Sequence, residues 1–462
     1  MNITKELAHF VFAVQYESIP QNVIRVEKQS ILDNIGIISG GADGDGCREF
    51  VEYAVDAAAG GREEATVLGF DIKLPAIWAA FSNASMTMSL DFADTSATAT
   101  IHPNTSTFAV CLALSEKLGG VSGKQFLTAM CVGSEVACRL ARAAVSSRFS
   151  GSGFYMPPVF TSFGATAAAC KLLGLSEEQI IDAWSLNLSQ YTCSSELTQN
   201  KASAIRSIRE AFGAKAAMSS AFLAQKGVKG FKDPFEGKEG FYHAYFDGEY
   251  NPEPVLEQLG HDWECSKLIF KPWPCCMGNH GCINAALNIM KENKININDI
   301  VSIHAEAATT AKAVCEPLED KKHPANAINA KYSIPFTVST AIVDGNVTLD
   351  SFTNEKLVRK EVLELADKFT YYLNEEWDNN LEYRMGGKLT IRTKDGKEYV
   401  NWVVKTLGNP ENPMDDESFK AKFISCMSKA PNPRTIDQSE AVFAHVMDLD
   451  CLIEMRELAK ML

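Results

Sequence analysis

The chain has 462 residues, of which 46% are hydrophobic and 22% charged, so it is long enough for two globular domains with sizeable cores. Its formal net charge of −14 disfavours nucleic acid and anionic membranes as partners, because both attract basic proteins. We expect a cytoplasmic protein with reduced thiols and no metal site, because its 13 cysteines include no Cys-x-x-Cys pair and no apolar run is long enough to span a bilayer.

Hydrophobic periodicity predicts one helix after another in the first two-thirds of the chain. Apolar residues recur at helical spacing over 23–38, and Gly40 and Gly41 stop this helix. Ser176 and Gln179 have the spacing of a capping box at the start of another helix. Further helices are expected over 108–117, 126–145, 164–173 and 214–225, and the last three are rich in small residues that permit close packing. The expected fold class is therefore mainly α, with a large helical domain.

The pattern changes after Trp263. Apolar and polar residues alternate over 297–307, and 389–404 has the pattern of two strands joined by a turn at 394–396. Helical patterns lie between them, over 331–343 and 354–365, and again near the end, over 415–426 and 441–461. We predict a smaller α+β domain over 267–407, and a helical domain that consists of 1–266 completed by 408–462.

The stretch 90–103 is the most informative in the chain, because two carboxylates, several hydroxyls and one imidazole lie there between apolar segments. In a helical turn Asp91 and Asp94 would share a face, where like charges raise one pKa, and Thr95 would lie one turn after Asp91. His102 is biased to an extended conformation by Pro103, and histidine has the side-chain pKa closest to neutrality. The stretch is a candidate site for proton transfer. Capping aspartates and a hydrogen-bonded loop histidine would explain the same pattern.

A second candidate is Lys271, which stands before Pro272 and Pro274 at the predicted domain boundary. Two prolines stiffen the backbone, and a rigidly placed cation suits a carboxylate ligand. An interdomain hinge with a solvated lysine explains this pattern as well. His280 follows shortly afterwards, either as part of the same site or as the capping residue of the next apolar helix.

Two further segments carry polar chemistry. Arg206 and Arg209 are three residues apart and can share a helical face, which would make a two-pronged anion clamp. With Lys201 and Lys215 nearby, a solvated helix face is the ordinary explanation. In the Gly- and Pro-rich loop 151–158, Tyr155 is the side chain best suited to donate or accept a proton. No phosphate-binding GxxxxGK pattern is present.

The ordered set of motifs resembles the MmgE/PrpD family. The blocks are Leu-Asp-Phe-x-Asp-Thr ending in His-Pro at 90–103, Ser-Phe-Gly-Ala-x-Ala-Ala-Ala at 162–169, Glu-Gly-x-x-Gly-Phe at 236–241, Phe-Lys-Pro-Trp-Pro-Cys-Cys at 270–276, Ala-Lys-Tyr-Ser-Ile-Pro at 330–335 and Asn-Pro-Glu-Asn-Pro at 409–413. The resemblance implies a helical domain with a smaller α+β lid domain, a homodimer, and chemistry beside a carboxylate without a metal or organic cofactor. The substrate would be a small di- or tricarboxylate in the cleft between the domains.

By position, Asp91, Thr95 and His102 match the family's first active-site block, and Lys271 matches its lysine at the lid boundary. Other positions depart from the family pattern. Ala93 stands where many members have a second acidic residue, and Tyr155 stands at the position of a histidine in the dehydratases and decarboxylases. Ile208, flanked by arginines, stands where those members have a lysine.

The chemistry implied is removal of a proton from a carbon next to a carboxylate, which requires fixed cations around the developing negative charge. We assign His102 as the base, Tyr155 as an acid, and Lys271 with Arg209 as the stabilising cations. The remaining residues that we place in the site are Asp91 and Thr95 beside the base, and Arg206, Asp94 and His280 on the substrate. The simplest reading is a metal-independent lyase of the dehydratase type. Alternatives are an epimerase or racemase of an amino- or imino-dicarboxylate, a cis-aconitate-type decarboxylase, or a non-catalytic protein that binds a carboxylate.

Overall fold

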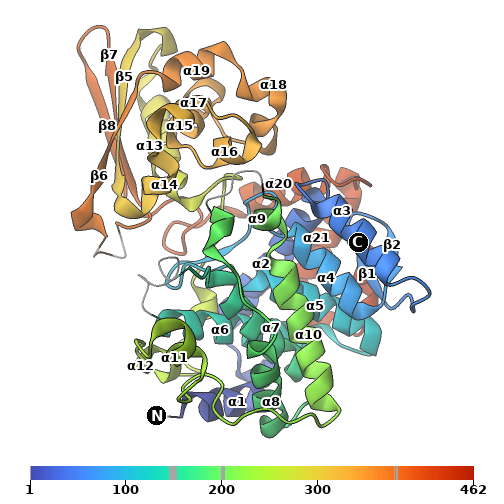
Figure 1. Ribbon diagram of the computed structural model, residues 1–462. Helices are drawn as coiled ribbons and strands as arrows, with labels where there is room; N and C mark the ends of the chain where they lie inside the picture. Colours follow the sequence, from blue (N-terminus) through green and yellow to red (C-terminus); the bar gives the residue numbers. More distant parts are fainter. Residues whose placement is uncertain (1, 145–152, 199–202, 379, 381–382) are drawn as a thin grey trace. The chain divides into compact units, whose positions relative to one another are not determined.

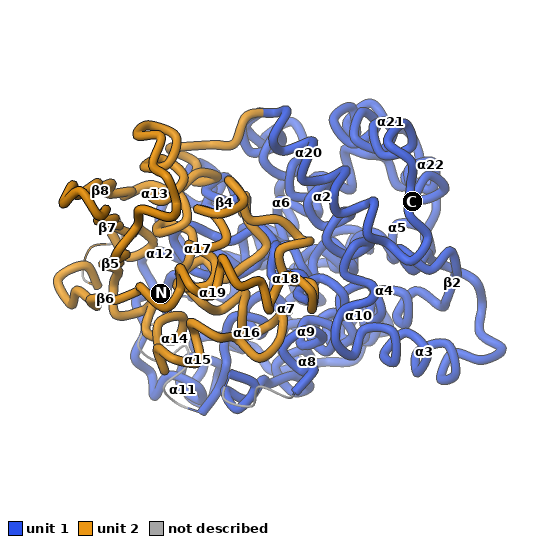
Figure 2. Tube along the Cα trace, turned by 90° about the horizontal axis from the view of Figure 1, so that it is seen from above, with its two compact units in different colours: residues 1–270, 416–462 blue, residues 271–415 orange. Residues whose placement is uncertain are grey.

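The computed structural model describes the chain except residues 1, 145–152, 199–202, 379 and 381–382 (Figure 1). The chain divides into two compact units (Figure 2). Unit 1 consists of residues 1–270 and 416–462, and unit 2 of residues 271–415. The chain thus enters unit 2 once, at Lys271, and returns once, at Asp416, to complete the first unit.

Unit 1 is built mainly of α-helices. They are α1 (Ile3–Ala13), α2 (Gln21–Gly40), α3 (Cys47–Ala57), α4 (Ala76–Met86), α5 (Asn104–Leu118), α6 (Gly123–Ala143), α7 (Pro157–Leu172), α8 (Glu177–Leu188), α9 (Ile205–Ile208), α10 (Glu210–Gln225), α11 (Phe241–Phe246), α12 (Glu253–Leu256), α20 (Asp416–Met427), α21 (Ile436–Met447) and α22 (Arg456–Ala459). The expected helices of the first two-thirds are present as α2, α5, α6, α7, α8 and α10. The predicted loop 151–158 and helix 126–145 reach into residues 145–152, which lie outside the described residues, as does Lys201.

Local signals explain where several of these helices begin and end. Ser176 accepts a hydrogen bond from the N–H of Gln179 at the start of α8, and the Gln179 side chain returns the capping-box bond. The single helix predicted over 441–461 is wrong: α21 ends at Met447, and Leu452 adopts an extended conformation before α22. The helix predicted over 354–365 is likewise interrupted, by an extended Arg359.

Small residues let the central helices of unit 1 pack closely. A β-carbon on Gly164 of α7 would lie 2.3 Å from the carbonyl oxygen of Gly133 on α6, so a side chain at either position would separate the two helices. The same holds between α2 and α20, where a β-carbon on Gly40 would lie 2.5 Å from the carbonyl oxygen of Cys426. The C-terminal segment is therefore docked tightly onto the N-terminal helices.

Two short antiparallel strand pairs complete unit 1. One joins β1 (Ala65–Val67) to β2 (Ile72–Leu74), and the other joins β3 (Thr95–Ser96) to β4 (Leu268–Ile269). Thr95 pairs with Ile269, and Ser96 with Leu268. The candidate stretch 90–103 is thus held against the last strand before the chain enters unit 2.

Unit 2 is an α+β unit with one four-stranded sheet in the order β6-β5-β7-β8. Its strands are β5 (Ile300–Ala308), β6 (Phe369–Asn374), β7 (Gly387–Thr393) and β8 (Glu398–Val403), and β5 runs parallel to β6 and antiparallel to β7. Its helices are α13 (Met277–Asn293), α14 (Lys312–Cys315), α15 (Leu318–Lys322), α16 (Ala327–Lys331), α17 (Ile334–Asp344), α18 (Asn354–Leu357) and α19 (Lys360–Ala366). Buried residues of α13, α17 and the sheet form one hydrophobic cluster, which gives this unit its own core.

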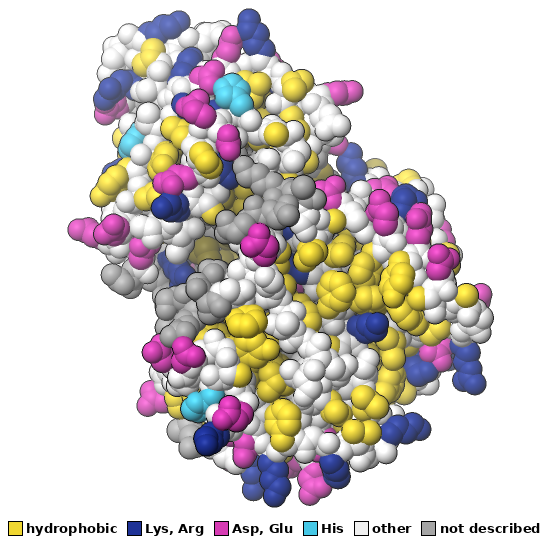
Figure 3. Space-filling model, viewed as in Figure 1, with side chains coloured by type: hydrophobic (Ala, Val, Ile, Leu, Met, Phe, Trp, Pro, Cys, Tyr) yellow, Lys and Arg dark blue, Asp and Glu magenta, His cyan; other side chains and the backbone are white. Residues whose placement is uncertain are grey.

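Large apolar side chains are also exposed on unit 1, where Figure 3 shows hydrophobic groups gathered over the face that carries α3, α9 and α10. Tyr53 is 55% exposed, Ile205 48% and Phe212 44%. The expected homodimer stays a prediction. Among the helices in the described part of the chain, none combines the length and hydropathy that crossing a membrane requires.

Candidate active site

The stretch from Asp91 to His102 is a loop around β3 and not a helix, so the prediction that Asp91 and Asp94 share a helical face is wrong. Pairing with β4 draws Thr95 into an extended conformation, so Thr95 does not follow Asp91 by one helical turn. Asp91 has a φ of 53°, in the left-handed region that aspartate tolerates better than most residues. Its N–H donates to the carbonyl of Met88 at 3.1 Å.

Two polar contacts hold Nδ1 of the His102 ring. Nδ1 lies 2.7 Å from the carbonyl oxygen of Asp94 and 3.2 Å from Oγ1 of Thr95. A carbonyl oxygen can only accept, so Nδ1 of the neutral ring carries the proton and Nε2 carries the lone pair. The loop therefore brings Thr95 and His102 together and presets the tautomer that a base acting through Nε2 requires.

The backbone of Asp94 is fixed because its side chain is buried in a polar network. One carboxylate oxygen of Asp94 accepts hydrogen bonds from Ser30 on α2 and from Asn104 on α5, the latter at 3.2 Å. The Asp94 N–H donates to Asp33 at 2.9 Å. Asp94 is fully buried and anchors the loop, and the substrate-binding role expected for it stays a prediction.

Burial, more than charge, sets the ionisation of this network. The pKa of Asp94 is raised to about 7, first by burial and then by the nearby carboxylate of Asp33. Glu27 on α2 is also fully buried, and its pKa is raised to about 8, first by burial and then by Asp94. The predicted pKa shift exists, but its partner is Asp33 and not Asp91.

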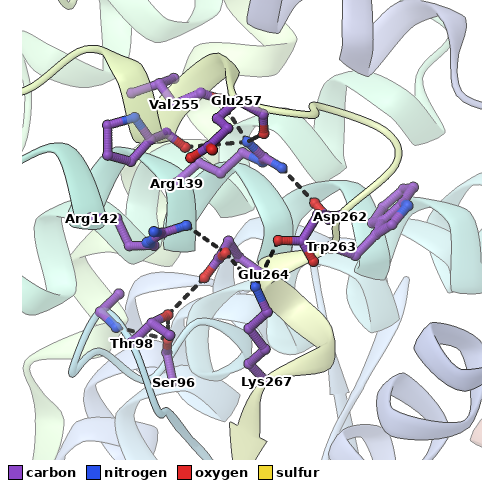
Figure 4. A network of polar contacts seen from close by, with 12 residues as sticks. Ser96, Thr98, Arg139, Arg142, Val255, Glu257, Asp262, Trp263, Glu264 and Lys267 are labelled. Atoms are coloured by element: carbon purple, nitrogen blue, oxygen red, sulfur yellow. Dashed lines mark hydrogen bonds and ion pairs between the residues drawn. The ribbon is translucent and has the colours of Figure 1, made fainter. Parts of the chain in front are cut away.

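The middle of the loop is held by a different set of contacts, shown in Figure 4. Glu264 is fully buried and accepts a hydrogen bond from Thr98 at 2.8 Å. It also accepts from Arg142 on α6 at 2.5 Å and from Lys267 at 2.8 Å. Next to it, Arg139 donates to the carbonyls of Val255, Glu257 and Asp262. These hydrogen bonds therefore connect the loop 91–102 to α6 and to the segment that leads into β4.

Tyr155 and Arg209 lie together, and polar contacts through Glu210 and Thr105 lead from Arg209 to the backbone carbonyl of His102. The guanidinium carbon of Arg209 lies 5.5 Å from the centre of the Tyr155 ring, and Arg209 Nε lies 3.4 Å from Glu210. Glu210 accepts from Thr105 at 3.2 Å, and the same hydroxyl lies 2.9 Å from the carbonyl oxygen of His102. Burial raises the pKa of Glu210, while Arg209 opposes the shift.

Arg206 is half-buried on α9, one turn before Arg209. Arg209 is itself 4% exposed, and one of its terminal nitrogens donates back to the carbonyl of Arg206. Because Glu210 already faces Arg209, part of its charge is neutralised within the protein. The two-pronged clamp stays a prediction.

Lys271 and His280 belong to unit 2. Lys271 is 1% exposed and is the first residue of that unit. His280 lies in the first turns of α13 and not at its cap, since Cys276 is the N-cap residue. Its ring is fully buried, edge-on to Trp273 with centroids 5.2 Å apart, and Nε2 lies 3.3 Å from the carbonyl of Cys275. Such a packed ring is typical of a core histidine.

Several residues of the site were missed by sequence reasoning. Glu27, Ser30 and Asp33 lie three apart on α2 and form one polar stripe on a helix otherwise predicted from its apolar residues. This polar stripe is the sequence signal from which these three residues could have been found. Glu264 gave none, because it is a charged residue far from the loop in sequence. Among the described residues, no group of three or more His, Cys, Asp or Glu side chains is arranged to hold a metal ion.

Comparison with known proteins gives two matches to domain families and several relatives. The profile of the MmgE/PrpD N-terminal domain matches residues 5–253, and that of the MmgE/PrpD C-terminal domain matches residues 273–447. Cis-aconitate decarboxylase from Mus musculus is 27% identical over 468 residues, which cover 98% of this chain and 93% of the relative. The Aspergillus terreus enzyme of that name is 24% identical over 477 residues, covering 100% and 96%. The 2-methylcitrate dehydratase of Salmonella typhimurium (strain LT2) is 22% identical over 401 residues, 81% of each chain.

Proposed function

Because this chain belongs to the MmgE/PrpD family of enzymes, we propose that it is a lyase that acts on a small di- or tricarboxylate by moving a proton at a carbon next to a carboxylate. The observation that carries the proposal is the contact of His102 Nδ1 with the Asp94 carbonyl, which leaves the lone pair on Nε2. The relatives support the substrate class, because aconitate and methylcitrate are tricarboxylates.

In the proposed reaction, His102 Nε2 takes the proton from the carbon next to the carboxylate. The Asp94 carbonyl stabilises the imidazolium that forms, because its oxygen accepts the Nδ1 proton in both charge states. Negative charge develops on the substrate carboxylate at the same time, and cations fixed near it lower the barrier. Arg209 is one such cation.

Lys271 is the second proposed cation. It follows Ile269 by two residues, and Ile269 pairs with Thr95. Two residues of chain span at most about 7 Å, so the backbone of Lys271 begins close to the strand that contains Thr95. This connection along the chain supports its assignment as a substrate-binding residue.

Tyr155 is the proposed acid. In a dehydration, the electron pair left by the proton forms the carbon–carbon double bond, and the leaving hydroxide takes a proton from Tyr155 to depart as water. The Tyr155 ring lies over Arg209, so this pair offers a hydroxyl and a cation side by side.

Decarboxylation is the second candidate, and the extent of the matches favours it. The relatives named cis-aconitate decarboxylase align with 98–100% of this chain, compared with 81% for the dehydratase. Here the bond to a carboxylate carbon breaks, carbon dioxide leaves, and the electron pair is protonated at carbon by Tyr155 or by His102 in its imidazolium form.

The test is a panel of di- and tricarboxylic acids incubated with the purified protein in heavy water and analysed by NMR and mass spectrometry. Loss of water from a hydroxy acid indicates a dehydratase, and release of carbon dioxide with deuterium in the product indicates a decarboxylase. Deuterium exchange without loss of a fragment indicates an epimerase. A protein that does none of these on the whole panel contradicts the proposal.

Tyr155→Phe tests the role of the Tyr155 hydroxyl as an acid without removing the cation Arg209. Phenylalanine keeps a ring over Arg209 and removes only the hydroxyl. We expect kcat of the reaction found in the panel to fall by about 100-fold or more, with little change in stability. If kcat stays at the wild-type level, Tyr155 is not the acid.

A further inference from the structure

A lysine from the C-terminal segment reaches the candidate loop through the core of unit 1. Lys422 lies on α20, and its side chain is 5% exposed. Nζ lies 2.6 Å from Asp33 and 2.9 Å from the carbonyl oxygen of Phe92, and 4.0 Å from the centre of the Phe92 ring. A charge this deeply buried requires partners, and all three of these contacts are to the loop or to the residue that anchors it.

These contacts form a continuous path to the base. Lys422 pairs with one carboxylate oxygen of Asp33, and the other oxygen accepts the N–H of Asp94. The carbonyl of the same residue, Asp94, accepts the Nδ1 proton of His102. Lys422 also fixes the carbonyl of Phe92, two residues before Asp94.

The helix that carries Lys422 is itself rigidly placed. The close approach of α20 to α2 at Gly40 leaves no space for a side chain, so α20 cannot slide along α2 without a clash. The backbone of Lys422 is therefore fixed relative to Asp33, which lies on the same helix α2.

From this geometry we infer that Lys422 is a positioning residue for His102: through Asp33 and the Phe92 carbonyl it holds Asp94 where the Asp94 carbonyl selects the Nδ1-protonated tautomer. The inference rests on the proposed function only for its effect on turnover. The tautomer is a property of the folded protein and exists without substrate. Outer contacts that orient a functional histidine commonly change activity by about 10–100-fold when removed.

Lys28 provides a matched control. Its side chain is 10% exposed, compared with 5% for Lys422, and Nζ also bonds one carboxylate, that of Asp450, and one backbone carbonyl, that of Met447. Both lysines link α2 to the C-terminal segment, but Lys28 contacts no residue of the loop 91–102. Lys28→Met therefore reports what loss of a buried lysine does to the fold alone.

Lys422→Met leaves Asp33 buried without its cation and can fail to fold for that reason. The double variant Asp33→Asn with Lys422→Met removes both charges and keeps a side-chain oxygen for the Asp94 N–H. If Lys422→Met does not fold, this double variant still tests the inference.

The experiment measures the ¹⁵N signals of His102 in protein labelled at histidine, with His102→Gln used to assign them, together with kcat and KM. In the wild type at high pH we expect Nδ1 protonated and Nε2 not. In the double variant we expect the two signals to move toward each other, as a mixture of tautomers requires, and kcat to fall by about 10–100-fold with a smaller change in KM. Lys28→Met should leave both readouts at wild-type values.

A folded double variant with the wild-type ¹⁵N signals and the wild-type kcat overturns the inference. The same shift in Lys28→Met also overturns it, because the effect would then belong to the fold in general. If the wild type turns over no carboxylate, the proposed function fails, while the ¹⁵N signals still decide whether Lys422 positions His102.

Discussion

Two buried carboxylates hold the same loop from different sides, and their partners differ in kind. Asp94 accepts from a hydroxyl and an amide, and a second carboxylate, Asp33, lies beside it. Glu264 accepts from two cations and a hydroxyl. A buried carboxyl group with an acidic neighbour favours its protonated form. Because the pKa of Asp94 is raised to about 7, the charge on the side of the loop that holds His102 can change near neutral pH.

Of the variants that test this comparison, Glu27→Gln is expected to change the free energy of unfolding most. The Glu27 pKa of about 8 in the folded protein lies above the ordinary glutamate value of 4.5, so wild-type stability falls as the pH rises between these values. Glu27→Gln has no carboxyl group to ionise, so the variant does not lose this stability as the pH rises. The variant-minus-wild-type difference in unfolding free energy should grow between pH 5 and pH 9, by up to about 4 kcal/mol.

Urea unfolding at several pH values measures that difference. A difference that does not change with pH would mean that Glu27 titrates alike in the folded and unfolded chain. That result would contradict the proposed difference between the two sides of the loop.

A smaller effect is expected from removing the charge on the other side. Glu264→Gln removes the carboxylate that Arg142 and Lys267 share, although Lys267 keeps Asp262 at 2.8 Å, and should cost about 2–3 kcal/mol of unfolding free energy. Asp94→Asn should cost only about 1 kcal/mol at pH 7, because one amide oxygen can accept both bonds that a single Asp94 oxygen now accepts. Equal losses in chemical denaturation would contradict the difference in partners.

The smallest effects come from one hydroxyl on each side. Thr98→Val and Ser30→Ala each delete one hydrogen bond to a buried carboxylate, and each should cost about 1 kcal/mol. Only Ser30→Ala should alter the pH dependence of kcat, because its hydroxyl lowers the pKa of Asp94. The same change in the pH profile for both variants would show that the two sides are not independent.

Much of the fold could be predicted from local signals. The capping box at Ser176, the stop after Gly40 and the small residues of α6 and α7 act within a few residues or on one helix face, so the sequence displays them. The interruptions at Arg359 and Leu452 could not be predicted, because no Gly or Pro marks them.

The sequence singled out His102 and Thr95 as candidates because polar residues cluster there between apolar ones, and their assignment to a site stays a prediction. The helical reading of Asp91 to Thr95 failed because the pairing of Thr95 with Ile269 depends on a segment far along the chain. Lys422 and Glu264 also contact the loop from segments far along the chain, and nothing in their local sequence indicates those contacts.

The central claim is that His102 is the base, and His102→Gln tests it most directly. Glutamine keeps a polar side chain but cannot take a proton near neutral pH. Measured on the acid that the wild type turns over, kcat should fall by about 100- to 10,000-fold while the thermal unfolding temperature stays unchanged. A folded His102→Gln protein that turns the substrate over at the wild-type rate would contradict the account.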